Sequence, residues 1–171
     1  GTLKWKLGMG VCGSYSAPTI GSDGTIYTAD YGYCGGAVPG SGSTAGGRNK
    51  DHKSSIYAIN SADGTIKWET RYPDVGPLGN QGIIRQAPVF HLDTIYIPGA
   101  GDGLLYALDS KTGNIKWKTS KAVAGRDLNS PTVRGDTIYM MGLDGVVYAI
   151  NSADGTIKWE TNTTTTAIGS S

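Results

Sequence analysis

The chain has 171 residues, among them 27 glycines and ten tyrosines, and its 15 basic and 14 acidic side chains leave a formal net charge of +1. This balance argues against a nucleic-acid binder, whose affinity would rest on clustered lysine and arginine. No apolar run approaches the roughly 18 residues of a membrane span, so we expect no membrane-spanning helix. Abundant glycine, threonine and serine, without a long segment of helical periodicity, indicate an all-β protein rich in turns.

The sequence repeats itself. Residues 57–70, YAINSADGTIKWET, return unchanged at residues 148–161, and a diverged copy, YALDSKTGNIKWKT, occupies residues 106–119. Residues 1–6, GTLKWK, match only the end of this pattern. The four tryptophans mark one point in each copy, and their separations are 63, 49 and 42 residues. The shortest interval falls in the range in which each repeat forms one small antiparallel sheet.

Each full copy predicts four strands. In the first copy, which spans residues 17–70, we expect strands near 17–20, 25–29, 56–60 and 65–70. In the second, spanning 87–119, we expect them from 87, at 94–98, at 104–108 and at 114–119. In the third, spanning 130–161, we expect them from 130, at 137–141, at 146–150 and at 156–161. Residues 1–8 predict an isolated fourth strand, and 162–171 the start of a further copy or a tail.

The middle strands carry apolar side chains on both faces, as in Ile26-Tyr27, Ile95-Tyr96 and Ile138-Tyr139. A sheet covered on both sides needs this pattern. Four-stranded sheets stacked around an axis form a β-propeller, which leaves only short, protected edges. A flat two-sheet sandwich is the alternative, but it gives no reason for so regular a repeat. The sequence therefore predicts three propeller blades and a spare N-terminal strand.

Short polar segments separate adjacent strands. The pairs Asp23-Gly24, Asp63-Gly64 and Asp154-Gly155 are typical of tight hairpins, whose backbone angles Gly and Asp tolerate. A calcium loop would need several more oxygen ligands at a defined spacing, so we interpret these pairs as turns and predict no metal site. Residues 134–136 spell the integrin-binding tripeptide but occupy the equivalent turn, and we interpret them likewise.

Chain direction reverses with each strand, which divides the connections between two edges of the array. One edge carries only short turns; we call it the short-turn edge. The other, the long-connection edge, carries residues 8–16, 31–53, 71–86 and 120–129. Cys12 and Cys34 both fall there, and we predict a disulfide between them that anchors the glycine-rich insertion at 31–53. Two buried free thiols are the alternative; a disulfide would indicate an oxidising compartment.

The segment 107–117, with Ala, Asp, Gly and Trp at the spacing A-x-D-x-x-x-G-x-x-x-W, resembles the tryptophan-docking motif of pyrroloquinoline quinone (PQQ)-type β-propellers. Residues 58–68 and 149–159 keep this spacing, with Asn60 and Asn151 where the family commonly has Asp. The resemblance covers nearly the whole chain. It implies blade docking through each fourth-strand tryptophan and each turn glycine, namely Trp5, Trp68, Trp117, Trp159, Gly64, Gly113 and Gly155.

The resembled family includes quinoprotein dehydrogenases, a propeller lipoprotein of outer-membrane barrel assembly, sensor ectodomains and cell-surface proteins. The dehydrogenases carry an adjacent Cys-Cys disulfide, a catalytic Asp and calcium ligands near the propeller axis. Here the cysteines are 22 positions apart, and Asp30, Asp51 and Asp74 are interpreted as ordinary loop carboxylates. We therefore predict no catalytic, cofactor-binding or metal-binding residues. A fragment of a dehydrogenase that uses PQQ with calcium is the alternative.

Three blades make an incomplete ring, so we expect the remaining blades from another chain, another copy or a longer precursor. The predicted function is a non-enzymatic scaffold in the periplasm, at the cell surface or secreted, which binds protein partners through the long-connection edge. Exposed aromatic and arginine side chains dominate protein contacts. The candidate partner-binding residues are Tyr31, Tyr33, Arg48, Tyr72 and Arg85.

Overall fold

The computed structural model describes residues 1–8, 16–30, 54–71, 86–99, 102–123, 130–142 and 145–163. These residues contain twelve strands and no helix. The strands are β1 Thr19–Ile20, β2 Ile26–Ala29, β3 Ser55–Ile59, β4 Ile66–Arg71, β5 Val89–His91, β6 Thr94–Pro98, β7 Leu105–Asp109, β8 Ile115–Lys118, β9 Thr132–Arg134, β10 Thr137–Met141, β11 Val146–Asn151 and β12 Ile157–Asn162. Within these ranges, a helix long and apolar enough to cross a membrane is absent.

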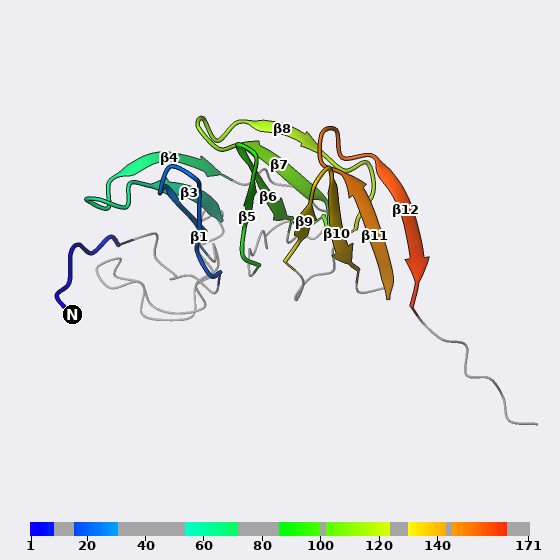
Figure 1. Cartoon of the computed structure of the whole chain (residues 1–171), viewed down its shortest axis with the longest axis horizontal. Helices are drawn as coiled ribbons and strands as arrows, with labels where there is room; N and C mark the ends of the chain where they lie inside the picture. The colour runs from blue at the N-terminus through cyan, green and yellow to red at the C-terminus, as the bar shows by residue number, and fades with distance from the viewer. Residues whose placement is uncertain are drawn as a thin grey trace, which may run out of the picture.

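The strands form three antiparallel sheets of four, each in chain order: β1-β2-β3-β4, β5-β6-β7-β8 and β9-β10-β11-β12. Figure 1 shows the sheets side by side as an open arc, with β4, β8 and β12 along its outer rim and β1, β5 and β9 on the opposite side. The predicted all-β architecture of four-stranded blades is confirmed. We call the sheets blades 1, 2 and 3.

The last two strands of each blade share one irregular register. A shift interrupts the pairing between Ala58 and Ile59, and the same shift recurs after Ala107 and after Ala149. In each blade the alanine lies opposite the tryptophan of the fourth strand, as Ala58 does with Trp68. Such a bulge increases local twist and re-aims the side chains that follow it. The repeated bulge therefore gives the three tryptophans equivalent positions.

The core lies between blades rather than inside them. One buried cluster joins blades 1 and 2, and a second joins blades 2 and 3. The first contains Tyr27, Ala29, Ile56, Ala58, Ile95, Ile97, Tyr106 and Leu108. The second contains Tyr96, Leu105, Ala107, Val123, Ile138, Met140, Tyr148 and Ile150. Because β6 and β7 contribute to both clusters, blade 2 is covered on both faces, as the apolar pairs predicted.

Two features differ from the sequence prediction. Residues 1–8 form no strand, because a ladder needs a neighbouring backbone and no described strand pairs with this segment. Several strands also begin one residue later than predicted. Thr25, Thr65 and Thr156 belong to the preceding turns, where each backbone amide donates a hydrogen bond to the Asp two residues earlier.

Two turn glycines allow a matched test of this packing. Gly113 has φ +75°, and a Cβ added there would lie 2.7 Å from the Trp68 ring, whereas Gly135 has φ +59° and nothing within 4 Å. We expect Gly113→Ala to lower the free energy of unfolding by about 2–4 kcal/mol, through backbone strain and overpacking. Gly135→Ala should cost only about 1 kcal/mol, through strain alone. Denaturant unfolding measures both; equal losses would contradict the packing described.

Candidate functional site

Each blade is joined to the next by a tryptophan that contacts the turn between the third and fourth strands of that next blade. The Trp68 Nε1 donates a hydrogen bond to the Ser110 carbonyl at 2.9 Å, and Trp117 Nε1 donates to the Ser152 carbonyl at 3.2 Å. Trp5 Nε1, in the N-terminal segment, donates to the Ser61 carbonyl at 3.0 Å. Three of the four tryptophans therefore make the same polar contact.

A glycine in each turn makes room for the indole. A Cβ added to Gly155 would lie 2.5 Å from the Trp117 ring, and one added to Gly64 would lie 2.6 Å from the Trp5 ring. Gly113 stands in the same relation to Trp68. We call one tryptophan, the serine carbonyl and the glycine it covers a docking joint. Any side chain at the glycine would displace the ring, which explains the fixed Ser-x-x-Gly spacing.

A tyrosine of the second strand completes each internal joint. Tyr27 and Tyr96 donate hydrogen bonds to the same serine carbonyls as the tryptophans, at 3.2 and 3.1 Å. Their rings lie 5.9 and 5.8 Å from the rings of Trp68 and Trp117, within the range of favourable aromatic pairs. Burial raises the pKa of both tyrosines, which favours the protonated hydroxyl that donates these bonds.

Blade 3 has a tryptophan and a tyrosine at the docking positions, but no turn of the described chain contacts them as in the internal joints. Tyr139 and Trp159 lie 6.1 Å apart, as in the two internal joints. However, Tyr139 is 37% exposed, whereas Tyr27 and Tyr96 are 2% and 3% exposed. Trp159 and Met141 are also exposed, at 47% and 45%. This face of blade 3 is therefore an open apolar surface.

At the short-turn edge, a lysine of the fourth strand braces the second strand of each blade. Lys67 Nζ donates to Thr25 Oγ1 at 2.6 Å. The equivalent bonds from Lys116 to Thr94 and from Lys158 to Thr137 measure 2.9 and 2.8 Å. The brace explains why threonine precedes Ile-Tyr and lysine precedes Trp in every copy.

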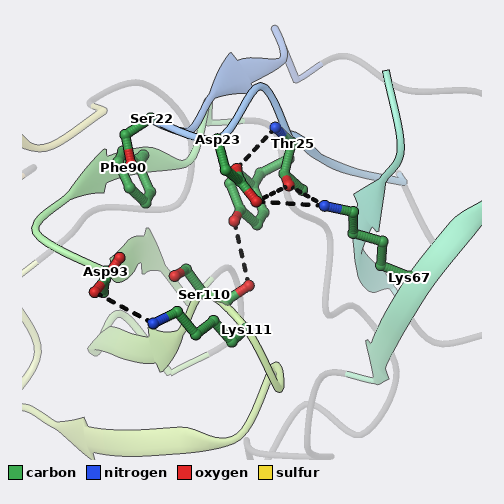
Figure 2. A pocket seen from close by; sticks show the side chains of 9 residues that line it. Ser22, Asp23, Thr25, Lys67, Phe90, Asp93, Ser110 and Lys111 are labelled. Carbon is green, nitrogen blue, oxygen red and sulfur yellow. Dashed lines mark hydrogen bonds and ion pairs between the residues drawn. The ribbon is translucent and has the colours of Figure 1, made fainter. Parts of the chain in front are cut away.

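A cleft of about 190 Å³ lies at this edge between blades 1 and 2. Figure 2 shows Asp23 and Lys67 on one side of it and Asp93 and Lys111 on the other. These ion pairs have N–O distances of 3.3 and 3.6 Å, and all four side chains are exposed. Exposed pairs contribute little to stability. The bond from Lys67 to Thr25, beside the cleft, recurs at the equivalent positions of blades 2 and 3. We therefore interpret the cleft as a product of blade structure.

At the long-connection edge, a buried carboxylate, Asp30, joins the residues that flank the 31–53 insertion. Asp30 Oδ1 accepts from the Ser55 amide at 2.7 Å, and Asp30 Oδ2 accepts from the Tyr57 hydroxyl at 3.0 Å. The Asp30 amide donates to the Ser55 carbonyl at 3.0 Å. Burial, and then the charge of Asp30, raises the pKa of Tyr57 to about 12. The end of β2 and the start of β3 are therefore fixed to each other by this group, which we call an Asp–Tyr clamp.

Blade 2 contains a related clamp, in which the Asp lies just before the third strand instead of at the end of the second. Asp102 Oδ1 accepts from the Leu104 amide at 3.0 Å, and Asp102 Oδ2 accepts from the Tyr106 hydroxyl at 2.5 Å. Burial is again the main cause that raises the pKa of the tyrosine. The sequence analysis missed both clamps. Only the blade 2 clamp has a local sequence signal, since the segment DGLLY at 102–106 has the same Asp–Tyr spacing as DGVVY at 144–148.

The described residues include only part of the predicted site. Trp5, Trp68, Trp117 and the three turn glycines form the docking joints, whereas Trp159 lies on the open face of blade 3. His91 Nε2 lies 3.0 Å from the Gly135 carbonyl, at the interface of blades 2 and 3. The candidate partner-binding residues and both cysteines lie outside the described residues, so their roles stay predictions: Tyr31, Tyr33, Arg48, Tyr72, Arg85, Cys12 and Cys34.

Four-stranded antiparallel blades, stacked side by side and joined by tryptophan docking, define a β-propeller. A family model described as outer membrane protein assembly factor BamB matches residues 50–171. The chain therefore belongs to this family of PQQ-type propeller repeat proteins. No curated protein sequence matches the chain significantly.

Solved structures of propellers share the fold. BamB from Moraxella catarrhalis aligns with a TM-score of 0.65 and 13% identity, over 93% of this chain and 39% of that protein. A quinohemoprotein alcohol dehydrogenase from Pseudomonas putida HK5 aligns at 0.61 and 18%, over 93% of this chain and 22% of the enzyme. The computationally designed Ika4 protein aligns at 0.59 and 12%, over 95% and 80%. The chain thus spans less than half the length of the first two.

The brace at the short-turn edge generates a pH-dependent prediction. Hydrogen bonds from the Thr25 side chain and then its amide lower the pKa of Asp23 from 3.8 to about 2, with a smaller contribution from Lys67. We expect Thr25→Val to raise this pKa toward 3.8, and Lys67→Met to raise it less. Because the pKa of Asp23 is lower in the folded than in the unfolded chain, its ionised form stabilises the fold above pH about 4. This contribution to the free energy of unfolding is lost as pH falls toward 2.

Carboxyl-carbon NMR titration measures the Asp23 pKa in both variants. A larger change in Lys67→Met than in Thr25→Val would contradict the assigned order of causes.

Proposed function

We propose that this chain is a non-enzymatic propeller scaffold that acts outside the cytoplasm and binds protein partners through its long-connection edge. The observation that carries the proposal is the difference between the two edges. Six short connections join the first to the second and the third to the fourth strand of each blade. At the opposite edge, β6 and β7 and also β10 and β11 are joined by short connections, but the other connections include residues 31–53, 72–85 and 124–129.

The turns of the short-turn edge adapt poorly to a partner, because their polar side chains accept hydrogen bonds from backbone amides of the same turn. Asn60 Oδ1 accepts from the Ala62 amide, Asp109 Oδ1 from the Lys111 amide and Asn151 Oδ1 from the Ala153 amide. Side-chain bonds of this kind hold a turn in one conformation. Recognition is more often carried by longer connections that a rigid scaffold positions.

The Asp–Tyr clamp of blade 1 supplies the scaffold for the largest connection. Its three hydrogen bonds join the residues that flank residues 31–53. Asp30 and Ser55 are both buried, so the clamp is shielded from water. The clamp therefore fixes the described residues on either side of the insertion that contains the candidates Tyr31, Tyr33 and Arg48.

The family membership supports a role in protein assembly, because the matching model describes an outer membrane protein assembly factor. It also supports a location in the cell envelope, in which a Cys12–Cys34 disulfide could form; mass spectrometry with and without reductant detects that bond. We propose that further propeller blades are supplied by another chain, another copy or a longer precursor. The near-neutral charge supports protein rather than nucleic acid as partner.

The alternative, a quinoprotein dehydrogenase fragment that binds PQQ and calcium, has less support. Similarity to the dehydrogenase extends to the fold alone, at 18% identity. Asp30, interpreted from the sequence as an ordinary loop carboxylate, is instead buried and accepts hydrogen bonds from the Ser55 amide and the Tyr57 hydroxyl. Its structural role accounts for its burial. After addition of PQQ and calcium, a PQQ absorption spectrum that is shifted from that of free PQQ and stays with the protein would favour the alternative.

The partner-binding proposal is tested by a five-residue variant in which Tyr31, Tyr33, Arg48, Tyr72 and Arg85 are changed to alanine. We expect it to lose cross-linking to envelope proteins without a change in far-UV circular dichroism, since exposed aromatic and arginine side chains carry most contact energy. The matched control changes the exposed Asp93 and Lys111 at the short-turn edge to alanine. Cross-linking retained by the five-residue variant, or lost equally in the control, would reject the assignment.

A further inference from the structure

The cleft between blades 1 and 2 has a lining that the joint between blades 2 and 3 does not repeat. The gap itself follows from blade structure, but two of the residues beside it differ from their counterparts. Lys111, in the receiving turn of blade 2, stands where blade 3 has Ala153. Phe90 stands where blade 3 has Val133, since each pairs with the isoleucine of the second strand. A charge and an aromatic ring are therefore particular to this cleft.

A glycine leaves the cleft open. Gly21 of blade 1 and His91 of blade 2 both lie opposite the threonine that precedes Ile-Tyr in the second strand. His91 spans the gap to blade 3, where its Nε2 lies 3.0 Å from the Gly135 carbonyl. Gly21 has no side chain that could do the same, and a Cβ there would lie 2.9 Å from the Tyr27 ring. The gap that His91 spans at one joint is thus unspanned at the other.

The two walls of the cleft differ in how firmly their charges are held (Figure 2). On the blade 1 wall, the Asp23 carboxylate accepts hydrogen bonds from the Thr25 amide, the Thr25 hydroxyl and Lys67, at 2.9, 2.7 and 3.3 Å. On the blade 2 wall, Lys111 Nζ lies 3.6 Å from Asp93 Oδ2, beyond ordinary hydrogen-bond distance. Asp93 and Lys111 can therefore each bind a further polar group.

The turn that carries Asp93 is strained. Leu92 and Asp93 have φ angles of 45° and 56°, a region that aspartate tolerates but that leucine rarely adopts. Blade 3 has Gly135 in place of Leu92. Strain of this kind persists where surrounding contacts fix the backbone. Here the Asp93 carbonyl accepts from the Ser110 amide at 3.1 Å, so the turn is fixed beside Lys111.

The lining determines the chemistry of a suitable ligand. Its two carboxylates and two ammonium groups make the cleft neutral overall, so a singly charged ion meets repulsion as well as attraction. A zwitterion can instead place each of its charges beside an opposite one. In an α-amino acid the ammonium and the carboxylate are attached to the same carbon, which suits a pair of charges 3.6 Å apart.

The size and the apolar surface of the cleft restrict the ligand further. The volume of about 190 Å³ is below the roughly 300–1,000 Å³ of pockets that hold drug-sized ligands. The rings of Tyr27 and Phe90 stack at 5.9 Å and both line the cleft. They offer apolar surface to a ligand side chain. A small molecule with one apolar group and two opposite charges therefore fits best.

We propose that the cleft between blades 1 and 2 binds a free α-amino acid with an apolar side chain. Lys111 binds its carboxylate, Asp93 binds its ammonium group, and its side chain packs on Phe90. Asp23 and Lys67 form the fixed opposite wall. This site lies at the short-turn edge, away from the edge proposed for protein partners, so the inference is independent of the proposed scaffold function.

Titration of the full ¹⁵N-labelled chain with L-leucine, followed by amide NMR shifts, tests the proposal. We expect saturable shifts at the cleft residues with a dissociation constant of about 1 mM, because both charged contacts are open to water. Two analogues lack one charge each: 4-methylpentanoate has no ammonium group, and 3-methylbutylamine has no carboxylate. Each should bind at least about tenfold more weakly, through loss of one charge-assisted contact.

The variant Lys111→Ala tests the assigned residue without disturbing the fold, because alanine stands at the equivalent position of blade 3. We expect it to weaken L-leucine binding by about tenfold or more. The matched control, Asp136→Asn, alters the exposed pair of Asp136 and Lys158 in blade 3 and should leave binding unchanged.

Three results would each overturn the proposal: no saturable shift at the cleft, equal binding of L-leucine and either analogue, or equal binding by Lys111→Ala and the parent chain. Equal shifts around Asp136 would also overturn it, since they would show that any exposed ion pair binds the ligand. Loss of partner cross-linking by the long-connection variant bears on the scaffold function alone, so the two proposals fail separately.

Discussion

The structure depends on the contact between an indole and a turn that lacks a side chain. Trp68 reaches from blade 1 to blade 2, donates its Nε1 hydrogen to the Ser110 carbonyl and covers Gly113. A buried carbonyl left unpaired would cost free energy, so the donor and the acceptor depend on each other. The glycine permits the approach, and the tyrosine of the second strand adds a further donor to the same carbonyl. Blade stacking follows from this small group of atoms.

This dependence separates the parts of the chain that resist change from those that tolerate it. The repeated segment at 57–70 contains a tryptophan, a receiving turn and the lysine of the brace, so it carries several of the residues that join strands and blades. The described parts of the long connections also serve the fold, since Asp30 forms the clamp and Val123 packs in the second cluster. The proposed function is assigned to the long-connection edge because its connections, unlike the repeat, differ in sequence from blade to blade.

Much of the fold could be predicted from the sequence because the repeat shows both strand periodicity and turn chemistry. The strand ends were less accurate, since threonines such as Thr25 bond to turn carboxylates instead of extending the ladder. The Lys67–Thr25 brace and the Asp30–Tyr57 clamp were missed because they join residues of different strands, and spacing along one strand does not give cross-strand register. The N-terminal segment matched a strand locally, but pairing requires a neighbour.

The candidate partner-binding residues are harder to place by the same reasoning. Residues 31–53 are rich in glycine and serine and lack the alternation from which a buried face can be inferred. Their arrangement depends on contacts distant in sequence, which composition does not specify. The docking tryptophans, by contrast, follow from the motif because the turn that receives each one keeps a serine and a glycine at fixed positions.

The most direct test compares Trp68→Ala with Trp159→Ala, because the two tryptophans lie in identical fourteen-residue segments and differ only in what they contact. Denaturant unfolding gives the free energy lost in each variant. If docking holds the blades together, Trp68→Ala costs about 3–5 kcal/mol, as expected for a packed aromatic side chain. Trp159→Ala then costs under about 1 kcal/mol, as at an exposed position. Equal losses would contradict the account, since they would show that the tryptophan stabilises its own sheet and not the joint.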